Sequence, residues 1–477
     1  MSRLIGFLGD GVTATDRRRI FRGTIYSFLI QGISIVLVFA SNWWLVRSTD
    51  TTSYGLYVHV FNWVSILSVL VMGGRDDLVL AQLPKYIGAG EDSRVRRLVR
   101  AANGWVFGAT LLIGGAFIGI ISLIPLRSLS EHRGLFLIAI AAVYFSASLS
   151  LNQMILQALN HIRQSQVVEK MVRPLLLLLF TGLFRLSAVR FDSRVLVLLG
   201  TIVSALCCGV ILGLIARKMR RLGGGVSTAE GATTGGATAG GVTTGEAATP
   251  GGATTGAASP DAPDERYGSK TTYFFIISLL NLLGTKVTML ILPLFAAESE
   301  VGVFNIAYRF ADLLIFPFFL MHSVLPQLFA RHSQAEKEYT RSLFNESTRL
   351  MTLISLPLLL VNIFAGHFLL RLFGPAFDNG YGALVLISIA QFLFSLFGPA
   401  NTILMMQGRE KYSAYCLGVY VVILVGCSWW LLPVAGITGG AIAILISSVV
   451  YNGLLNGITW RFYGICTPFL TFRRKGE

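Results

Sequence analysis

The sequence predicts an all-α polytopic membrane protein of about twelve transmembrane helices, arranged as two similar six-helix bundles. Apolar residues make up 54% of the chain and charged residues only 13%, and the mean hydropathy is +0.67. A soluble protein cannot bury that much apolar surface, whereas a bilayer accepts it as helices of about 20 residues. Apolar runs of this length recur along the chain, and the second half repeats the first.

The predicted spans form two sets of six. The fifth is short and contains Arg185. The first set covers residues 20–46, 54–74, 101–125, 135–158, 174–190 and 195–216, and the second covers 271–295, 301–327, 350–372, 381–406, 414–432 and 437–459.

The basic residues predict the orientation of these spans. Most of the 39 Lys and Arg residues fall in segments that are cytoplasmic when both termini are cytoplasmic, such as 17–19, 217–221 and 473–475. This is the bias that the positive-inside rule describes. We therefore expect a multi-pass protein of the plasma (inner) membrane whose net charge of +15 reflects topology and contact with lipid. Binding of nucleic acid is not expected.

A segment of different composition separates the two bundles. Residues 222–265 are rich in Gly, Ala and Thr, contain no aromatic residue, and lack the Lys that a phosphate-binding loop requires. Such a segment is typical of a flexible tether. The expected organisation is thus a bundle at 1–220, a cytoplasmic linker at 221–270, a second bundle at 271–460, and a basic tail at 461–477.

Two short matches indicate that the halves are a duplication. Residues 79–83 after span 2 match 324–328 after span 8, and 155–156 after span 4 match 403–404 after span 10. The offset is 245 to 248 residues in both places. Because six is an even number of spans, the halves share one orientation, and the repeat axis is predicted to run along the membrane normal.

Span 8 carries the first group of candidate site residues. Asn305, Arg309 and Asp312 fall at i, i+4 and i+7, on one face of a helix. Ionisable residues inside a membrane usually face a cavity or a partner. Arg309 is expected about 10 Å below the outer end. The face either lines a central water-filled cavity or holds an Arg–Asp pair that locks helices together.

Lys286 lies near the middle of span 7, about 15 Å from either end, which is too deep for its stem to reach the interface. Its neighbours on that face are apolar, such as Leu283 and Met289. We expect a cation that faces the cavity and serves an anionic substrate or the chemistry of a coupling ion. A buried pair, for example with Asp312, is the alternative.

The first half shows polar but mostly uncharged counterparts. Gln31 lies in a helical stripe of serines on span 1 that includes Ser34 and Ser41, and Asn62 and Ser65 on span 2 correspond to Arg309 and Asp312. We expect a cavity between the halves that is charged mainly on the second side. Hydrogen bonding between helices explains any single residue of this set equally well.

Two further features flank the spans. Arg75, Asp76 and Asp77 follow span 2, where they are expected to gate the cavity, contact lipid headgroups or form a solvated helix end. Gly-x-x-x-Gly patterns at 115–119 and 209–213 predict close helix packing.

The motifs that are missing exclude several enzyme classes. The sequence has no Walker-type loop, no His/Glu metal cluster, no paired-carboxylate site and no channel filter motif. Its five cysteines lack metal-ligand spacing, and the outer loops are short. We expect a transporter rather than an enzyme, with no metal or cofactor beyond a possible coupling to Na⁺ or H⁺.

Several segments of the second half carry a resemblance to a known family. The chain resembles the polysaccharide-transporter branch of the multidrug/oligosaccharidyl-lipid/polysaccharide exporter superfamily, which includes O-antigen flippases. The resemblance rests on the twelve-span layout and on residues 301–304 (Val-Gly-Val-Phe), 308–309 (Tyr-Arg), 325–328 (Leu-Pro-Gln-Leu), 372–377 (Leu-Phe-Gly-Pro-Ala-Phe), 407–409 (Gln-Gly-Arg) and 434–441 (Val-Ala-Gly-Ile-Thr-Gly-Gly-Ala).

This resemblance implies a V-shaped pair of bundles that moves a polyprenyl-diphosphate-linked glycan to the outer leaflet by alternating access. Other polysaccharide-assembly proteins would be its partners. Lys286 and Arg309 are then the expected cations for the diphosphate. A cation-coupled multidrug exporter of the same superfamily would share the fold but prefer an acidic cavity, for which Asp312 is the one candidate. A membrane-embedded glycan polymerase or ligase would need a large outer loop, which the sequence lacks.

Overall fold

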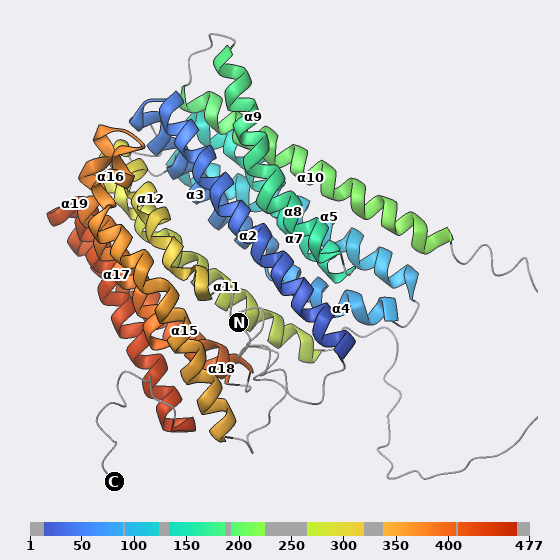
Figure 1. The fold of residues 1–477 in the computed structure, drawn as a ribbon. Helices are drawn as coiled ribbons and strands as arrows, with labels where there is room; N and C mark the ends of the chain where they lie inside the picture. Colours follow the sequence, from blue (N-terminus) through green and yellow to red (C-terminus); the bar gives the residue numbers. More distant parts are fainter. Residues whose placement is uncertain are drawn as a thin grey trace, which may run out of the picture.

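The computed structural model describes residues 14–88, 91–123, 133–159, 161–186, 192–224, 265–318, 337–406 and 409–464. Within these ranges every regular element is helical, which confirms the all-α class. The helices form two lobes side by side (Figure 1). The first lobe contains α2 (Ala14–Ser48), α3 (Thr51–Met72), α4 (Arg75–Gly88), α5 (Asp92–Leu123), α7 (Arg133–Ala158), α8 (Ile162–Val167), the π-helical segment η1 (Val168–Val172), α9 (Arg173–Leu186) and α10 (Ser193–Gly224).

The second lobe repeats this plan. It contains α11 (Glu265–Ile291), η2 (Leu292–Leu294), α12 (Glu298–Asp312), η3 (Leu313–Ile315), α15 (Lys337–Phe364), α16 (Gly366–Arg371), η4 (Pro375–Gly380), α17 (Tyr381–Phe397), α18 (Ala400–Met406) and α19 (Glu410–Tyr463). Each lobe has its own apolar core, as expected for two structural repeats.

Nine helices in the described part of the chain are long and apolar enough to cross a membrane. The predicted twelve spans require three more crossings. The apolar part of α11, from Ser278 to Leu294, is a shorter candidate, and α9 is a helix of 14 residues at the position of the predicted span 5. The third arises because α19 reverses direction at Gly436, where φ is 54° and ψ is −136°.

Ring contacts show that the two arms of α19 are antiparallel. The centroids of Tyr412 and Phe462 lie 5.2 Å apart, and those of Tyr420 and Tyr451 lie 5.4 Å apart. The first arm thus corresponds to the predicted span 11 and the second arm to span 12. A left-handed backbone is accessible to Gly at low cost, which permits the reversal at Gly436.

Several predicted boundaries were wrong. Span 9 was expected to reach residue 372, but α15 ends at Phe364 and the short helix α16 follows. Span 10 breaks at Gly398, where a Cβ atom would lie 2.1 Å from Thr348 Oγ1. The residues predicted as 319–327 of span 8, most of the linker and tail (225–264 and 465–477) and the motif residues 324–328 and 407–408 lie outside the described residues.

The lobes meet most closely where α3 crosses α12. A Cβ atom on Gly55 would lie 1.7 Å from the carbonyl oxygen of Glu298, and one on Gly302 would lie 3.4 Å from the Gly55 Cα atom. Gly55 and Gly302 occupy equivalent positions of the two repeats, 247 residues apart. The repeat axis therefore passes close to this contact.

The predicted close packing at the Gly-x-x-x-Gly patterns was wrong. A Cβ atom on Gly115, Gly119, Gly209 or Gly213 would meet no atom of the described residues within 4 Å. These glycines lie on open faces of α5 and α10, so the spacing alone did not identify the contact between helices.

We predict that Gly55→Ala lowers the midpoint of thermal unfolding of the protein in detergent, because the new methyl group would separate α3 from α12. Overpacking of this kind costs about 1–3 kcal/mol. Gly209→Ala is the matched control, since alanine on an open helical face is favoured over glycine by up to about 1 kcal/mol. Equal midpoints for the two variants would contradict the assignment of the crossing.

Candidate functional site

A cavity of about 370 Å³ lies between the lobes. Residues of α2, α3, η1, α9 and α10 form most of its wall, and residues of α11 and α12 close it from the second lobe. The wall combines charged groups, small hydroxyl and amide side chains, and two aromatic rings. It is therefore a polar space inside a protein whose outer surface is largely apolar, which is the arrangement expected where a polar ligand crosses the membrane.

The second lobe places three of the predicted residues in this wall, namely Lys286, Asn305 and Arg309. Lys286 and Arg309 are partly buried and interact electrostatically with one another. Arg309 Nε is buried and has no hydrogen-bond partner among the described residues. An unsatisfied charged donor of this kind is costly, so Arg309 has spare capacity to bind an anion.

Asp312 is the last residue of α12. Its Oδ1 atom accepts a hydrogen bond of 3.2 Å from Nε2 of Gln391 on α17, and its charge interacts with Lys286 and Arg309 over a longer range. Of the predicted stripe of span 8, Asn305 and Arg309 line the cavity, whereas Asp312 is exposed and is not part of this wall.

The first lobe contributes charges that the sequence did not predict. Lys170 and Arg173 line the cavity beside Glu169. Lys170 Nζ donates a hydrogen bond to Gln31 Oε1, and Arg173 Nη2 donates one of 3.4 Å to Ser204 Oγ. The expectation of a cavity charged mainly on the second side was therefore wrong, and Gln31 acts by holding Lys170.

Lys170 and Arg173 were missed because span 5 was expected to begin at residue 174, after the last charge. In the structure α8, η1 and α9 follow one another with helical backbone from Ile162 to Leu186. The charges lie within and just after the π-helical segment η1, a feature that is frequent at functional sites. The i, i+3 spacing of Lys170 and Arg173 is the signal that could have identified them.

Neutral groups complete the wall. Asn62 lines the cavity as predicted from its position, and its Nδ2 atom lies 3.5 Å from Met289 Sδ across the lobes. Tyr57 and Phe61 present their rings with centroids 4.7 Å apart. Tyr57 interacts electrostatically with both Arg173 and Arg309, so the cations of the two lobes surround one phenol.

A chain of hydrogen bonds joins the lobes beside the cavity. Asn305 Nδ2 donates to the hydroxyl of Tyr54 at 2.9 Å, and this hydroxyl donates to Oδ1 of Asn42 at 3.0 Å. Tyr54 is fully buried. Because each group satisfies the next, the chain closes the cavity toward the Gly55 crossing without leaving these polar atoms unpaired.

A second connection, here called the Leu372 latch, fastens α2 to the second lobe. Three N–H groups donate to the single carbonyl oxygen of Leu372: Trp43 Nε1 at 2.9 Å, Arg47 Nη2 at 3.1 Å and Arg47 Nε at 3.3 Å. Leu45 and Val46 also belong to the apolar core of the second lobe. This contact between the lobes lies on the side that the sequence predicts to face outward.

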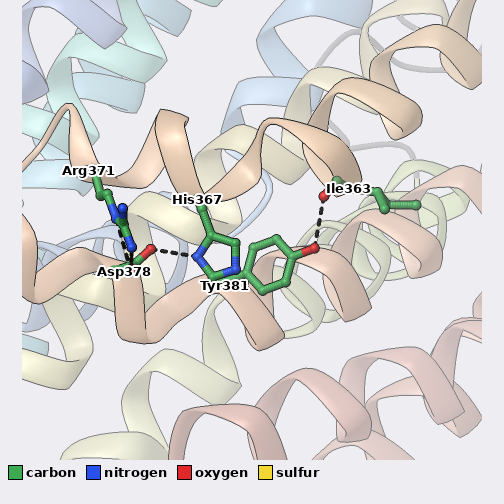
Figure 2. A network of polar contacts seen from close by, with 5 residues as sticks. All are labelled: Ile363, His367, Arg371, Asp378 and Tyr381. Carbon is green, nitrogen blue, oxygen red and sulfur yellow. Dashed lines mark hydrogen bonds and ion pairs between the residues drawn. The ribbon is translucent and has the colours of Figure 1, made fainter.

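Figure 2 shows the polar network that shapes the segment carrying this carbonyl. Arg371 Nη2 and His367 Nδ1 contact the two carboxylate oxygens of Asp378 at 2.8 and 2.7 Å. The His367 ring stacks on Tyr381 at 3.8 Å, and the Tyr381 hydroxyl donates to Ile363 O at 2.8 Å. These contacts tie α16 to η4 and α17 and so fix the turn that presents Leu372.

Of the predicted gate residues, Arg75 and Asp76 are not part of the cavity wall. The guanidinium of Arg75 lies 3.3 Å from the ring centroid of Trp105 on α5. The Trp105 indole donates to Val71 O at 3.0 Å, so this stack fastens the end of α3 to α5. Asp76 is partly buried at the start of α4, and the side chain of Asp77 lies outside the described residues.

We predict that Trp43→Phe combined with Arg47→Gln weakens the Leu372 latch, because it removes the three donors and keeps most of the packing. Spin labels at Thr52 and Asn379, in a background without native cysteines, should show a longer and broader distance distribution by pulsed electron resonance. Trp430→Phe is the control, since Trp430 is 73% exposed on α19. An unchanged distribution in the double variant would show that the latch does not hold the lobes.

The geometry can be compared with known proteins. A family model described as MatE matches residues 274–430, within the second lobe. Teichuronic acid biosynthesis protein TuaB of Bacillus subtilis (strain 168) is 26% identical over 140 residues. That match covers 29% of this chain and 29% of the relative, so the chain spans well under two thirds of the curated relative it matches.

Solved structures match over nearly the whole chain. The lipid II flippase MurJ in an inward closed conformation has a TM-score of 0.65 at 10% identity, covering 91% of this chain and 87% of that one. A multidrug resistance MATE family transporter of the MOP superfamily in its inward-facing conformation has a TM-score of 0.60 at 14% identity. The match covers 90% of this chain and 94% of that one. A MOP superfamily transporter from Pyrococcus furiosus with a binding pocket of reverse polarity has a TM-score of 0.61 at 12% identity. The match covers 92% of this chain and 95% of that one.

At these identities the structures show the fold alone. The chain has the two-lobe fold of MOP superfamily transporters, and its second lobe contains a MatE-type sequence. The proteins that it resembles in this way are transporters and a flippase.

Proposed function

We propose that the protein is a flippase that moves a polyprenyl-diphosphate-linked oligosaccharide from the cytoplasmic to the outer leaflet of the inner membrane. The observation that carries this proposal is the cavity, which four cations line against one carboxylate: Lys170, Arg173, Lys286 and Arg309 against Glu169. Alternating access of the two lobes would carry the headgroup across, and the product would enter polysaccharide assembly such as that of O-antigen lipopolysaccharide.

The chemistry of this substrate fits the wall. A diphosphate joined to a lipid and a sugar is an anion that binds Arg and Lys through charge-assisted hydrogen bonds. Sugar hydroxyls need donors and acceptors, which Asn42, Asn62 and the serines of α2 and α3 supply. The names of two similar proteins support the same class, since one acts in teichuronic acid biosynthesis and the other is a lipid II flippase.

The second candidate is a cation-coupled multidrug exporter. The MatE match and the structural likeness to MATE transporters favour it. A cavity that collects cationic drugs should carry net negative charge, because like charges repel strongly in a low-dielectric site. The excess of cations disfavours this candidate. Coupling to Na⁺ or H⁺ and cytoplasmic termini belong to the proposal for either function, and contacts with other polysaccharide-assembly proteins belong to the flippase alone.

The proposal predicts that deleting the gene makes one lipid-linked oligosaccharide accumulate in the inner leaflet. Complementation with Lys286→Gln or Arg309→Gln should lower export at least about tenfold, since each variant removes a charge-assisted contact worth about 1.5–3 kcal/mol. Mass spectrometry of extracted glycolipids and surface polysaccharide measures this. Arg194→Gln is the control, because Arg194 is an exposed cation at the start of α10.

Two results would contradict the flippase. One is a deletion strain with unchanged glycolipids and new sensitivity to cationic drugs, which would favour the exporter. The other is normal export by both cavity variants at normal protein levels, which would remove the cations from the mechanism.

A further inference from the structure

Two aromatic side chains of α3 interrupt the polar wall of the cavity. Tyr57 and Phe61 lie one helical turn apart, and both line the cavity. Their ring centroids are 4.7 Å apart and the ring planes meet at 49° or less, at an angle of 44°. Both side chains are partly buried. The two rings therefore form one aromatic surface on the first lobe's side of the cavity, here called the aromatic floor.

Phe61 is the less expected of the two rings. Its neighbours Val60 and Val64 are buried in the apolar core of the first lobe, whereas Phe61 belongs to neither of the two apolar cores formed by the described residues. A phenyl ring has no polar atom with which to bind the amide, hydroxyl and charged groups of the cavity wall. Its exposure there is unfavourable unless an apolar surface covers it. The ring is thus suited to a ligand that has an apolar face.

The backbone of α10 holds the Phe61 ring in place. A Cβ atom on Gly200 would lie 2.4 Å from Phe61 Cζ and 2.8 Å from Phe61 Cε2, so the tip of the ring rests on this glycine. Glycine inside a helix is less favourable than alanine, and the contact with the ring explains its presence. Gly209 and Gly213 of the same helix would meet no described atom within 4 Å. Gly200 also lines the cavity, so the contact fixes the ring at the wall.

The aromatic floor lies beside the groups that the proposed function assigns to the diphosphate. Tyr57 interacts electrostatically with Arg173 of the first lobe and Arg309 of the second. Asn62, which follows Phe61 in the chain, adds an amide to the same wall. A sugar joined directly to a diphosphate among these cations would therefore reach the rings.

Pyranose sugars have an apolar face that complements the ring of Phe61. Where the hydroxyl groups are equatorial, axial C–H bonds form a patch on each face of the sugar, and the hydroxyl groups lie at its rim. The hydrogens of this patch are slightly positive and the face of an aromatic ring is negative, so the two surfaces attract while both leave water. The rim hydroxyls can then bind polar groups of the wall, such as those of Asn62 and Ser65.

We propose that Phe61 determines specificity for the sugar nearest the diphosphate, because its ring stacks on a pyranose with equatorial hydroxyl groups. Gly200 is the positioning residue that lets the ring lie against α10, and Tyr57 extends the floor toward the cations. This inference rests on the proposed function and specifies which part of the substrate the first lobe recognises.

Binding of two matched probes to the full chain in detergent micelles tests this proposal. Both probes are short-prenyl diphosphates. One carries glucose, and the other carries the open-chain hexitol sorbitol, which has hydroxyl groups but no ring face. Isothermal titration calorimetry gives the Kd of each. The measured quantity is the ring preference, defined as the Kd of the hexitol probe divided by that of the glucose probe, in which the contacts of the shared diphosphate cancel.

The wild-type protein should prefer the glucose probe by about fivefold, the effect of one aromatic stack. Phe61→Leu should lower the ring preference to about one and leave the Kd of the hexitol probe unchanged, because leucine is apolar but has no aromatic face. Phe61→Tyr should retain the preference. Phe364→Leu is the matched control, since Phe364 is 82% exposed at the end of α15 and is not part of the cavity wall.

Gly200→Ala tests the positioning role. The added methyl group would displace the Phe61 ring, so the ring preference should fall toward one. In a Phe61→Leu background the same substitution should change neither Kd, because the ring that it displaces is gone. Such non-additivity is expected for two residues in direct contact. Gly209→Ala, on an open face of the same helix, is the control and should match the wild type.

The outcomes separate the inference from the proposed function. A wild-type ring preference near one, with both probes bound, would overturn the inference and leave the flippase standing. A Phe61→Leu variant that keeps the preference, or that loses affinity equally for both probes, would lead to the same conclusion, since the ring would then serve the packing of the helices. Additive effects of the two substitutions would remove Gly200 from its positioning role. Failure of both probes to bind would contradict the inference and the proposed function together.

Discussion

The close crossing of α3 and α12 at Gly55 and Gly302 determines where the cavity residues lie. Because both residues lack a side chain, the two backbones approach within reach of direct contact, and the register of the helices is fixed there. Two turns further along each helix come Asn62 and Arg309, again 247 residues apart, and both line the cavity. The Tyr54 hydrogen bonds lie between the crossing and the cavity and close that end.

The repeat supplies the scaffold, and differences between the halves supply the chemistry. Lys286 and Arg309 correspond, at the offset of 247 residues, to Phe39 and Asn62, which carry no charge. At the offset of 248 found for residues 155 and 403, Lys170 corresponds to Gly418. A duplicated fold thus encloses a space whose charges come from single positions in one half or the other, which is how a function is added to a fold that serves several transporters.

The sequence identified cavity residues whose charge is energetically unfavourable inside a membrane. It missed residues whose role depends on which helix packs against them. Lys286 and Arg309 could be predicted because a charge deep in an apolar span demands an explanation. Lys170 lies before residue 174, where span 5 was predicted to begin, so it was not among the candidate site residues. The Gly-x-x-x-Gly patterns suggested contacts at open faces, whereas single glycines such as Gly55 make the closest one. A glycine at a helix contact differs from one on an open face only in whether another helix packs against it, which the sequence of its own helix does not show.

The positions of the cations connect ligand binding to the movement of the lobes. Two of the four cavity cations belong to each lobe, so their repulsion opposes a closed cavity, and an anion bound between them removes that repulsion. The Leu372 latch and the shared apolar core near Leu45 hold one end of the interface together. A ligand shifts such an equilibrium only by the difference in its affinity for the two states. In the proposed flippase, the anionic headgroup supplies that difference when it contacts both lobes, and its departure restores the repulsion that favours separation.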